Sequence, residues 1–387
     1  MRDGEVMTEI PLEPSAHSLA DVMPSVAASL GSGHHNPLAI APASDAVLVL
    51  VDGLGAELIR RYAADAPTLA VMSSRMISAG FPATTATSLT SLAVGAPCSK
   101  HGLVGYSFRI SDDADDTAVS FNPLRWTLDS ADGPSAMDRF PPRRIQQRSS
   151  LLEHLASDGV DVTYVMREEF RESGLTRAAF RADGGFRSAV SLDEVKQGVI
   201  NAVGRPSRSR RFVYAYYGDL DLIGHIHGPG SPEWLESLRA VDAFIADLAT
   251  DLPRDCRLIV TADHGMVNAE TVVDIDHTPA LLADVEIVAG EARVRHAYAR
   301  PGAADDVLHA WRAELAGHAR VISREQAIDE RLFGPDRTYA DRLGDVIAIA
   351  SGGVILSRSE HEPMESSLLG HHGANTAAEQ HIPLILR

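Results

Sequence analysis

The chain has 387 residues, of which 45% are hydrophobic, 23% charged and only 5% aromatic, the composition of a soluble globular protein. Its formal net charge of −18 disfavours non-specific binding to nucleic acid polymers and to anionic membranes. This charge does not exclude small anionic substrates, because bound metal cations reverse the field locally. The two cysteines, Cys98 and Cys256, imply neither a disulfide framework nor a cysteine-based zinc site.

The N-terminal residues 1–26 are acidic and lack an apolar stretch of the length found in signal peptides. No run in the chain approaches the roughly 18 apolar residues that are needed to span a membrane. We therefore expect a cytoplasmic protein that does not associate with membranes.

Apolar runs alternate with helical patterns along the chain. The runs are rich in β-branched residues and do not alternate with polar ones, which is typical of strands covered on both faces. They span residues 46–51, 162–166, 211–217, 257–262 and 382–386, and the helical patterns span 56–76, 149–159 and 231–252. Strands that alternate with helices predict an α/β fold, with a mostly parallel central sheet sandwiched by helices.

Two regions fit this alternation less well. Residues 107–145 are polar, with several Asp and Pro, and indicate a long excursion from the sheet. Residues 270–350 mix short strand patterns with a helical one and contain no sharp motif. We expect a single domain over residues 1–387, with 270–350 as a small inserted cap subdomain.

Four short polar motifs occur at or near the ends of apolar runs. Each alone is an ordinary turn or loop sequence, but together they place aspartates and histidines at strand ends, where open α/β sheets bind their ligands. Carboxylate and imidazole without thiolate suit two divalent cations, with zinc preferred and manganese as the alternative. The motifs are VLVLVDGLG with Asp52, DLDLIGHIHGPG with Asp221 and His225, LIVTADHGM with Asp263 and His264, and LLGHHGANT with His372. Asp219, His227 and His371 are competing candidates within these motifs.

Such a ligand set lacks a nucleophile, and one segment of the chain offers hydroxyl groups. The stretch GFPATTATSLTSLAVG, residues 80–95, carries six Thr and Ser within eight positions, just before an apolar helical run. Two metal ions about 3.5–4 Å apart clamp the attacking and leaving oxygens of an in-line displacement at phosphorus. A hydroxyl at the start of a helix, where free N–H groups favour an anion, suits that reaction.

These motifs resemble a known group of enzymes. VDGLG, FPATTATSLTSLAVGAPCSKHGL, DLIGHIHGP, TADHGM and GHHGANT occur in the order seen in the alkaline phosphatase superfamily, and are most similar to its nucleotide pyrophosphatase/phosphodiesterase branch. The resemblance covers most of the chain, from Val47 to Thr376. It implies an alkaline phosphatase-like fold and a metal-dependent hydrolase of phosphoric esters or phosphoanhydrides. The implied substrate is a small anionic phosphoester, such as a nucleotide.

The resemblance also implies roles for particular residues. In that branch the catalytic threonine lies ten residues before a glycine that precedes a His-Gly pair by six, which selects Thr85 here, ahead of Gly95 and His101. Thr85 would form a phosphothreonine intermediate. The Asp-x-x-Gly-His and Gly-x-His-Gly spacings select Asp221 over Asp219 and His372 over His371. One metal is implied on Asp221, His225 and His372, and the other on Asp52, Asp263, His264 and the Thr85 hydroxyl.

The chain departs from the branch at one position. Those phosphodiesterases, and the similar phosphonoacetate hydrolases, carry an asparagine three residues after the threonine to hold a phosphate oxygen. Here that residue is Ser88, the candidate substrate-binding residue, which has a shorter reach. Two alternatives therefore stay open: a phosphomonoesterase or phosphonate hydrolase with the same metals, and a non-catalytic metal-binding regulatory protein.

Overall fold

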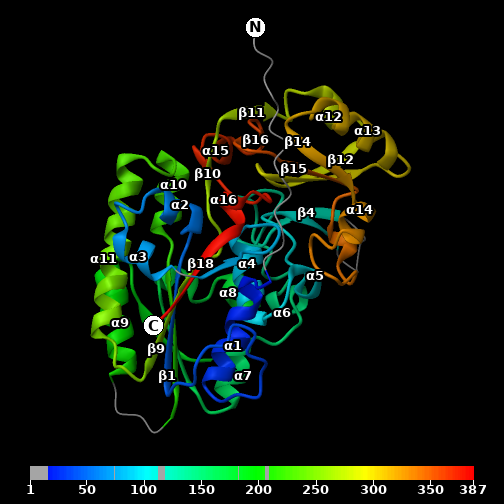
Figure 1. Ribbon diagram of the computed structural model, residues 1–387. Helices are drawn as coiled ribbons and strands as arrows, with labels where there is room; N and C mark the ends of the chain where they lie inside the picture. Colours follow the sequence, from blue (N-terminus) through cyan, green and yellow to red (C-terminus); the bar gives the residue numbers. More distant parts are fainter. Residues whose placement is uncertain (1–15, 74, 112–117, 182, 205–208) are drawn as a thin grey trace.

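The computed structural model describes residues 16–73, 75–111, 118–181, 183–204 and 209–387. Residues 1–15, most of the N-terminal segment for which the absence of a signal peptide is predicted, lie outside the described residues. So do residues 112–117, near the start of the 107–145 excursion. Figure 1 shows a larger α/β part, which contains the central sheet, and a smaller part beside it.

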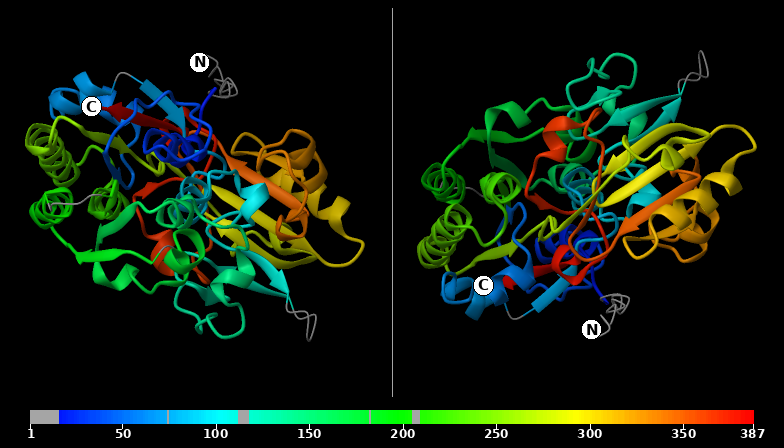
Figure 2. Two further views of the ribbon diagram at one scale, coloured as in Figure 1. Left: turned by 90° about the horizontal axis from the view of Figure 1, so that it is seen from below. Right: turned by 90° about the horizontal axis from the view of Figure 1, so that it is seen from above.

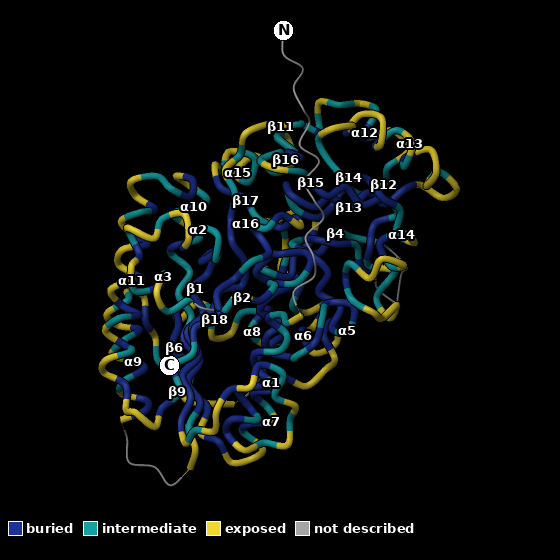
Figure 3. Tube along the Cα trace, in the orientation of Figure 1, coloured by how far each residue is buried: buried dark blue, intermediate teal, exposed yellow. Residues whose placement is uncertain are grey.

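The central sheet is mostly parallel, as predicted. Its strand order is β2-β18-β9-β1-β8-β6-β7 among the described residues. The five strands from β9 to β7 run parallel, while β18 is antiparallel to β9 and β2 is antiparallel to β18. Every residue of β1 is buried, because both faces of the sheet are covered (Figure 3). The strands are β1 (Asp45–Val51), β2 (Arg75–Ser78), β6 (Asp161–Met166), β7 (Gly185–Ser188), β8 (Arg211–Tyr217), β9 (Cys256–Thr261) and β18 (His381–Leu386).

Helices cover the sheet on two sides, with α3, α9 and α11 on one side and α1, α4 and α7 on the other (Figure 1). The patterns at 149–159 and 231–252 form α7 and α11, as expected. The helices of this part are α1 (Val22–Ser29), α2 (Ala56–Arg61), α3 (Pro67–Met72), α4 (Thr85–Val94), α5 (Cys98–His101), α6 (Pro142–Ile145), α7 (Leu151–Ser157), α8 (Gly174–Ala179), α9 (Leu192–Val203), α10 (Asp219–His227), α11 (Pro232–Asp251), α15 (Pro363–Ser366) and α16 (Ala377–Gln380). Short 3₁₀ helices occupy Leu19–Asp21, Glu168–Phe170 and Ala340–Arg342.

The helical pattern at 56–76 is not one helix, and this prediction is wrong. It forms α2 and α3, and its last residues join the edge strand β2. Pro67 stands at the start of α3, where a missing N–H is tolerated; inside a continuous helix the ring would clash with the preceding turn. α2 therefore ends at Arg61, and Pro67 begins a second helix after a short turn.

Residues 270–350 contain an antiparallel sheet in the order β12-β13-β15-β14, which lies beside the central sheet (Figure 2). Trp311 of α13 is fully buried against this sheet and belongs to a hydrophobic core separate from the main one. The elements are β12 (Val285–Glu291), β13 (Val294–Ala299), β14 (Ala319–Ser323), β15 (Val346–Ala350), α12 (Pro279–Leu282), α13 (Ala304–Glu314) and α14 (Arg324–Asp329). We call this part the side subdomain; its role as a cap stays a prediction.

The described residues of the 107–145 excursion form a small antiparallel sheet of β3 (Phe108–Ser111), β4 (Ala118–Asn122) and β5 (Thr127–Leu128). Ser107 and Gly290 exchange backbone and side-chain hydrogen bonds of 2.9–3.0 Å, so this sheet is attached to the side subdomain. Two short ribbons complete the fold: β10 (Val267–Asn268) with β17 (Gly370–His371), and β11 (Thr271–Asp274) with β16 (Val354–Ser357).

Within the described ranges, no helix has the length and apolar character needed to cross a bilayer. The expected cytoplasmic location stays a prediction.

Candidate active site

Three neighbouring parallel strands bring the predicted site together. β9, β1 and β8 lie side by side, so their carboxyl ends meet at one edge of the sheet. Asp52 follows β1 directly, Asp263 and His264 follow β9, and α10 begins just after β8. Gly53, with φ of 72°, turns the chain after Asp52; a Cβ there would lie 3.1 Å from Oδ1 of Asp221. The turn therefore requires glycine.

The first cluster consists of Asp221, His225 and His372. Asp221 and His225 lie one helical turn apart on α10, and His372 approaches from the segment after β17. The Nε2 atom of His225 lies 3.3 Å from Oδ2 of Asp221 and 3.3 Å from Nε2 of His372. The Nε2 atom of His372 lies 3.9 Å from Oδ1 of Asp221. All three offer ligand atoms within 4.8 Å of one another, close enough to bind one metal ion.

The second cluster surrounds His264. Its Nε2 atom lies 3.4 Å from Oδ1 of Asp52, 3.3 Å from Oδ2 of Asp263 and 3.2 Å from Oγ1 of Thr85. Asp52 and His264 also lie within 4.8 Å of an oxygen of Asp221, which is therefore shared between the two clusters.

Backbone carbonyl groups orient all three imidazole rings in the same way. Nδ1 of His225 donates to the carbonyl of Gly370 at 2.7 Å, and Nδ1 of His372 donates to that of Ala83 at 2.8 Å. Nδ1 of His264 donates to the carbonyl of Gly265 at 3.1 Å. A proton held at Nδ1 leaves the Nε2 lone pair directed into the clusters, the arrangement found at metal-binding histidines.

Burial and mutual repulsion disfavour the charged form of carboxylates in the clusters, and bound cations would offset this cost. Burial raises the pKa of Asp52 well above its ordinary value, and the charges of Asp263 and Asp221 raise it further. Burial likewise raises the pKa of Asp263. Oδ1 of Asp52, Oδ1 of Asp221 and Oδ2 of Asp263 are buried, and within the described residues they accept no hydrogen bond. Buried carboxylate oxygens without donors, beside imidazole nitrogens, fit divalent cations.

Asp221 behaves differently from the other two aspartates. Burial acts to raise its pKa, but the charge and hydrogen bond of His225 outweigh this, so its pKa lies below the ordinary value. Burial acts to lower the pKa of His225, but Asp221 outweighs it and raises that pKa to about 9. Burial, with the nearby charge of His264, lowers the pKa of His372.

The competing candidates lie outside both clusters. The Asp219 carboxylate accepts a hydrogen bond of 2.6 Å from Arg167. Nε2 of His371 donates to the carbonyl of Leu368 at 3.0 Å, and His227 is exposed. The geometry thus brings together the six predicted metal ligands and separates them from the alternatives. Which of them bind metal stays a prediction.

Thr85 is the first residue of α4, and Thr84 is its N-cap. The first N–H that bonds within this helix is that of Ser88, to the Thr84 carbonyl at 2.9 Å, so the N–H groups of residues 85–87 have no acceptor within the helix. Ser88 itself is 1% exposed, and its hydroxyl has no hydrogen-bond partner among the described residues. Its predicted contact with substrate stays a prediction.

Sequence reasoning missed Tyr216, whose hydroxyl donates a short hydrogen bond to Oδ2 of Asp52. Tyr216 lies near the end of β8 in a run of aromatic residues that suggests only packing. The pairing of β8 with β1 places Tyr216 beside Leu50 and Tyr217 beside Val51. This pairing brings the Tyr216 hydroxyl to Asp52, the residue that follows Val51.

Two cavities meet at Thr85. The first, of 350 Å³, is lined by Asp52, Phe170 and Tyr216, and the second, of 260 Å³, by His225, His372 and Glu291. The residues common to both are Thr85, Leu124, Arg125, Asp221 and Leu222.

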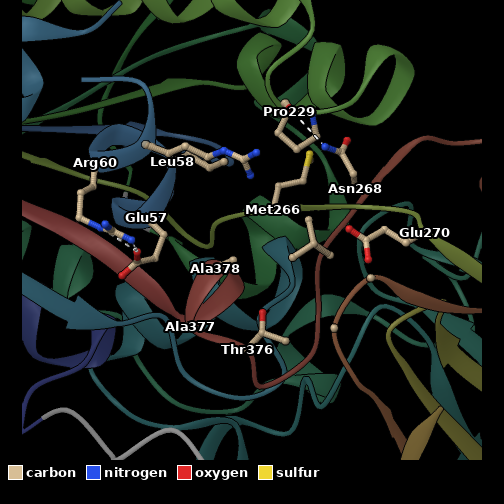
Figure 4. A pocket seen from close by; sticks show the side chains of 14 residues that line it. Glu57, Leu58, Arg60, Pro229, Met266, Asn268, Glu270, Thr376, Ala377 and Ala378 are labelled. Atoms are coloured by element: carbon tan, nitrogen blue, oxygen red, sulfur yellow. Dashed lines mark hydrogen bonds and ion pairs between the residues drawn. The ribbon is translucent and has the colours of Figure 1, made fainter. Parts of the chain in front are cut away.

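A larger cavity of 540 Å³ lies apart from the clusters. It is lined by Met266 and by the ion-paired Glu57 and Arg60, and none of the predicted ligands is among the described residues that line it (Figure 4). The largest of these three cavities is therefore not one of the two that meet at Thr85.

The α/β sandwich and the carboxylate–imidazole clusters at its strand ends define a member of the alkaline phosphatase superfamily. The chain belongs to the type I phosphodiesterase / nucleotide pyrophosphatase family, whose model matches residues 46–375. The members of this family are hydrolases that act on phosphoester bonds.

Curated relatives match short parts of the chain. Human ectonucleotide pyrophosphatase/phosphodiesterase family member 7 is 38% identical over 63 residues, which is 15% of this chain and 14% of that protein. An uncharacterized pyrophosphatase/phosphodiesterase of Schizosaccharomyces pombe is 31% identical over 88 residues, 21% of this chain and 18% of that protein. The chain thus matches less than a fifth of the length of these relatives.

Solved structures match most of the chain. Murine ectonucleotide pyrophosphatase / phosphodiesterase 5 has a TM-score of 0.66 at 19% identity, covering 88% of this chain and 87% of that one. An inactive form of the same protein was solved in complex with AMP. Phosphonoacetate hydrolase from Sinorhizobium meliloti, in complex with phosphonoformate, has a TM-score of 0.61 at 19% identity, covering 88% and 89%. At this identity the likeness shows the fold.

Proposed function

We propose that this protein is a metal-dependent phosphodiesterase or nucleotide pyrophosphatase with Thr85 as its nucleophile. The observation that carries the proposal is the meeting of two cavities at Thr85 and Asp221. A phosphodiester has two substituents on phosphorus, one that leaves and one that is retained, whereas a monoester has only one. Two separate cavities offer a place for each substituent of a diester.

The two clusters would hold two divalent cations, with zinc favoured by the donor set and manganese as the alternative. His225, His372 and Asp221 would hold one, and Asp52, Asp263, His264 and the Thr85 hydroxyl would hold the other. When bound, the cations would supply the Lewis acidity that lowers the pKa of the Thr85 hydroxyl and offsets charge on the phosphoryl group.

The chain's own residues perform the positioning. Oγ1 of Thr85 attacks phosphorus, the bond to the leaving oxygen breaks, and a phosphothreonine forms that water then hydrolyses. The free N–H groups at the start of α4 face the phosphoryl oxygens, and the helix dipole favours their negative charge. The hydroxyl of Tyr216 holds the Asp52 carboxylate in one orientation.

A nucleotide is the first substrate to test. Phe170 and Tyr216 form an edge-to-face pair with centroids 5.6 Å apart on the wall of the first cavity. Aromatic walls suit a nucleobase, and the murine relative was solved with AMP.

The test compares hydrolysis of bis(p-nitrophenyl) phosphate, p-nitrophenyl phosphate and phosphonoacetate by the protein loaded with zinc or with manganese. We expect kcat/KM for the diester to exceed that for the other two. A preference for the monoester or the phosphonate would support the rival hydrolase instead. Bound metal without hydrolysis of any of the three would support a regulatory protein.

A further inference from the structure

Arg125 stands at the junction of the two cavities, in a region where the sequence shows no motif. It lies in the turn between β4 and β5, beside the side subdomain (Figure 1). Its N–H donates to Oδ1 of Asn122 at 2.9 Å. It is one of the five residues that line both cavities, together with Thr85 and Asp221.

The turn that presents Arg125 is anchored by the next residue. Trp126 is only 2% exposed, and its Nε1 donates to the carbonyl of Phe140 at 2.9 Å. Its ring packs edge-on against Phe121, with centroids 4.9 Å apart. Its φ of 59° lies in the left-handed region, which a bulky residue adopts only where the surroundings hold it. The buried indole therefore fixes the backbone from which the Arg125 side chain projects.

Arg125 differs from the other arginines near the site because it has no anionic partner among the described residues. Arg167, in the first cavity, pairs with Asp219 at 2.6 Å. Arg295 pairs with Glu362, which lines the second cavity, at 2.7 Å. The Arg125 guanidinium forms neither a hydrogen bond nor an ion pair within the part of the chain that the structure describes. Its charge is available to a ligand.

A donor to the phosphoryl group is also needed, because Ser88 does not supply one in this structure. Ser88 is the substrate-binding residue that the sequence predicts. It is 1% exposed and is absent from the described linings of both cavities. Arg125 is an exposed residue that lines both cavities together with Thr85, so its guanidinium can supply a cationic donor to a phosphoryl group bound there.

We propose that Arg125 is a catalytic residue whose guanidinium binds a non-bridging oxygen of the substrate's phosphoryl group. This inference rests on the proposed function. A guanidinium stays charged at all working pH values and forms charge-assisted hydrogen bonds to phosphate oxygens. From the junction of the two cavities, it stabilises the charge that spreads over these oxygens as the leaving group departs.

The first experiment measures kinetics on bis(p-nitrophenyl) phosphate with zinc-loaded Arg125→Ala, Arg125→Lys and wild-type protein. Arg254→Ala, which removes an exposed arginine from a loop remote from both cavities, is the matched control. We expect kcat/KM to fall by about 100-fold for Arg125→Ala, the usual loss on removal of one transition-state donor. Arg125→Lys should retain part of the activity, and added guanidinium should partly restore Arg125→Ala. Metal content and the thermal midpoint should not change.

The second experiment measures binding without turnover and separates the two proposals. Inorganic phosphate is titrated calorimetrically into zinc-loaded Thr85→Ala, with and without Arg125→Ala. We expect Arg125→Ala to weaken phosphate binding by at least about tenfold. If the wild type hydrolyses no phosphoester but this loss appears, the function fails and the anion-binding role of Arg125 stands. If the wild type is active and Arg125→Ala changes neither kcat/KM nor the phosphate Kd by more than about twofold, the role of Arg125 is overturned.

Discussion

The strand ends of the central sheet and the segments attached at its side contribute to the site by different means. Asp52 and Asp263 are placed by the strands that they directly follow, and a few neighbouring residues determine their position. Arg125, Glu291 and Arg293 come from the small sheet and the side subdomain, and only packing over long sequence distances brings them near the clusters. Changes at the strand ends should therefore abolish chemistry, whereas changes in the side segments should lower activity less, as at Arg125, or alter stability, as at Arg293 and Glu291.

The hairpin between β12 and β13 is one connection between these regions. Arg293 is buried and forms a bidentate pair with the buried Glu379, with two contacts of 2.9 Å. Glu379 also accepts the N–H of Ala374 at 3.0 Å and the hydroxyl of Thr376 at 2.6 Å. These contacts hold the segment that follows His372. The side subdomain thus supports a ligand of the first cluster through one ion pair.

The largest effect is expected at the nucleophile. Thr85→Ala should lower kcat by about 10⁴-fold, because the covalent path is removed. Metal content should stay the same, since six other side chains form the clusters. Thr85→Ser should keep measurable activity, and Thr84→Ala, the neighbouring control, should cost far less. Loss of activity in Thr84→Ala alone would show that the register is wrong by one residue.

The second prediction contrasts cluster residues with their sequence neighbours. Asp221→Ala and His372→Ala should each lose about one bound cation and more than about 100-fold in activity, because each offers ligand atoms to a cluster. Asp219→Ala and His371→Ala should keep both cations, since their side chains bind Arg167 and Leu368 instead. Elemental analysis of the purified variants measures this. Equal metal loss within each pair would contradict the assignment.

The third prediction concerns the connection to the side subdomain. Arg293→Met should lower the free energy of unfolding by about 3–5 kcal/mol, because the Glu379 carboxylate is left buried without its cation. Arg60→Met, the control, breaks a pair in which the Arg60 side chain is 78% exposed, and should cost no more than about 1 kcal/mol. Denaturant titration of both variants measures the difference. Similar costs would mean that the hairpin is not an important support.

The last prediction concerns Glu291, which receives a hydrogen bond from Thr84 beside the nucleophile. Burial raises the pKa of Glu291 to about 8 from 4.5, against the lowering by Thr84. Between these two values the unfolded chain releases a proton that the folded chain keeps, so folding stability contributed by this group falls as pH rises. Glu291→Gln removes the ionisable carboxyl and, with it, this loss of stability at higher pH.

We therefore expect Glu291→Gln to unfold at a higher temperature than the wild type at pH 8, by an amount equivalent to about 4 kcal/mol. The difference should vanish below about pH 4.5, where the carboxyl is protonated in both states. Thermal unfolding at pH 4, 6 and 8 measures it. A constant difference at all three values would assign the effect to packing instead of ionisation.

The sequence predicts the parts of this molecule that depend on local patterns. Buried runs such as residues 46–51 and 257–262 indicate strands, and the polar residues just after them indicate the edge where the site forms. The break at Pro67 was missed because both halves of the 56–76 pattern are helical. Arg125 and Glu291 could not be predicted, since their proximity to Thr85 depends on how two sheets pack and not on any spacing along the chain.

The Nδ1 atoms of the three histidine rings are all held by main-chain oxygens, those of Gly370, Gly265 and Ala83. A carbonyl acceptor remains when the side chain of its residue, or of a neighbour, is exchanged during evolution. The ring geometry is therefore buffered against mutation around it. Such a site can keep its ring geometry while the residues that line its substrate cavities change in the course of evolution.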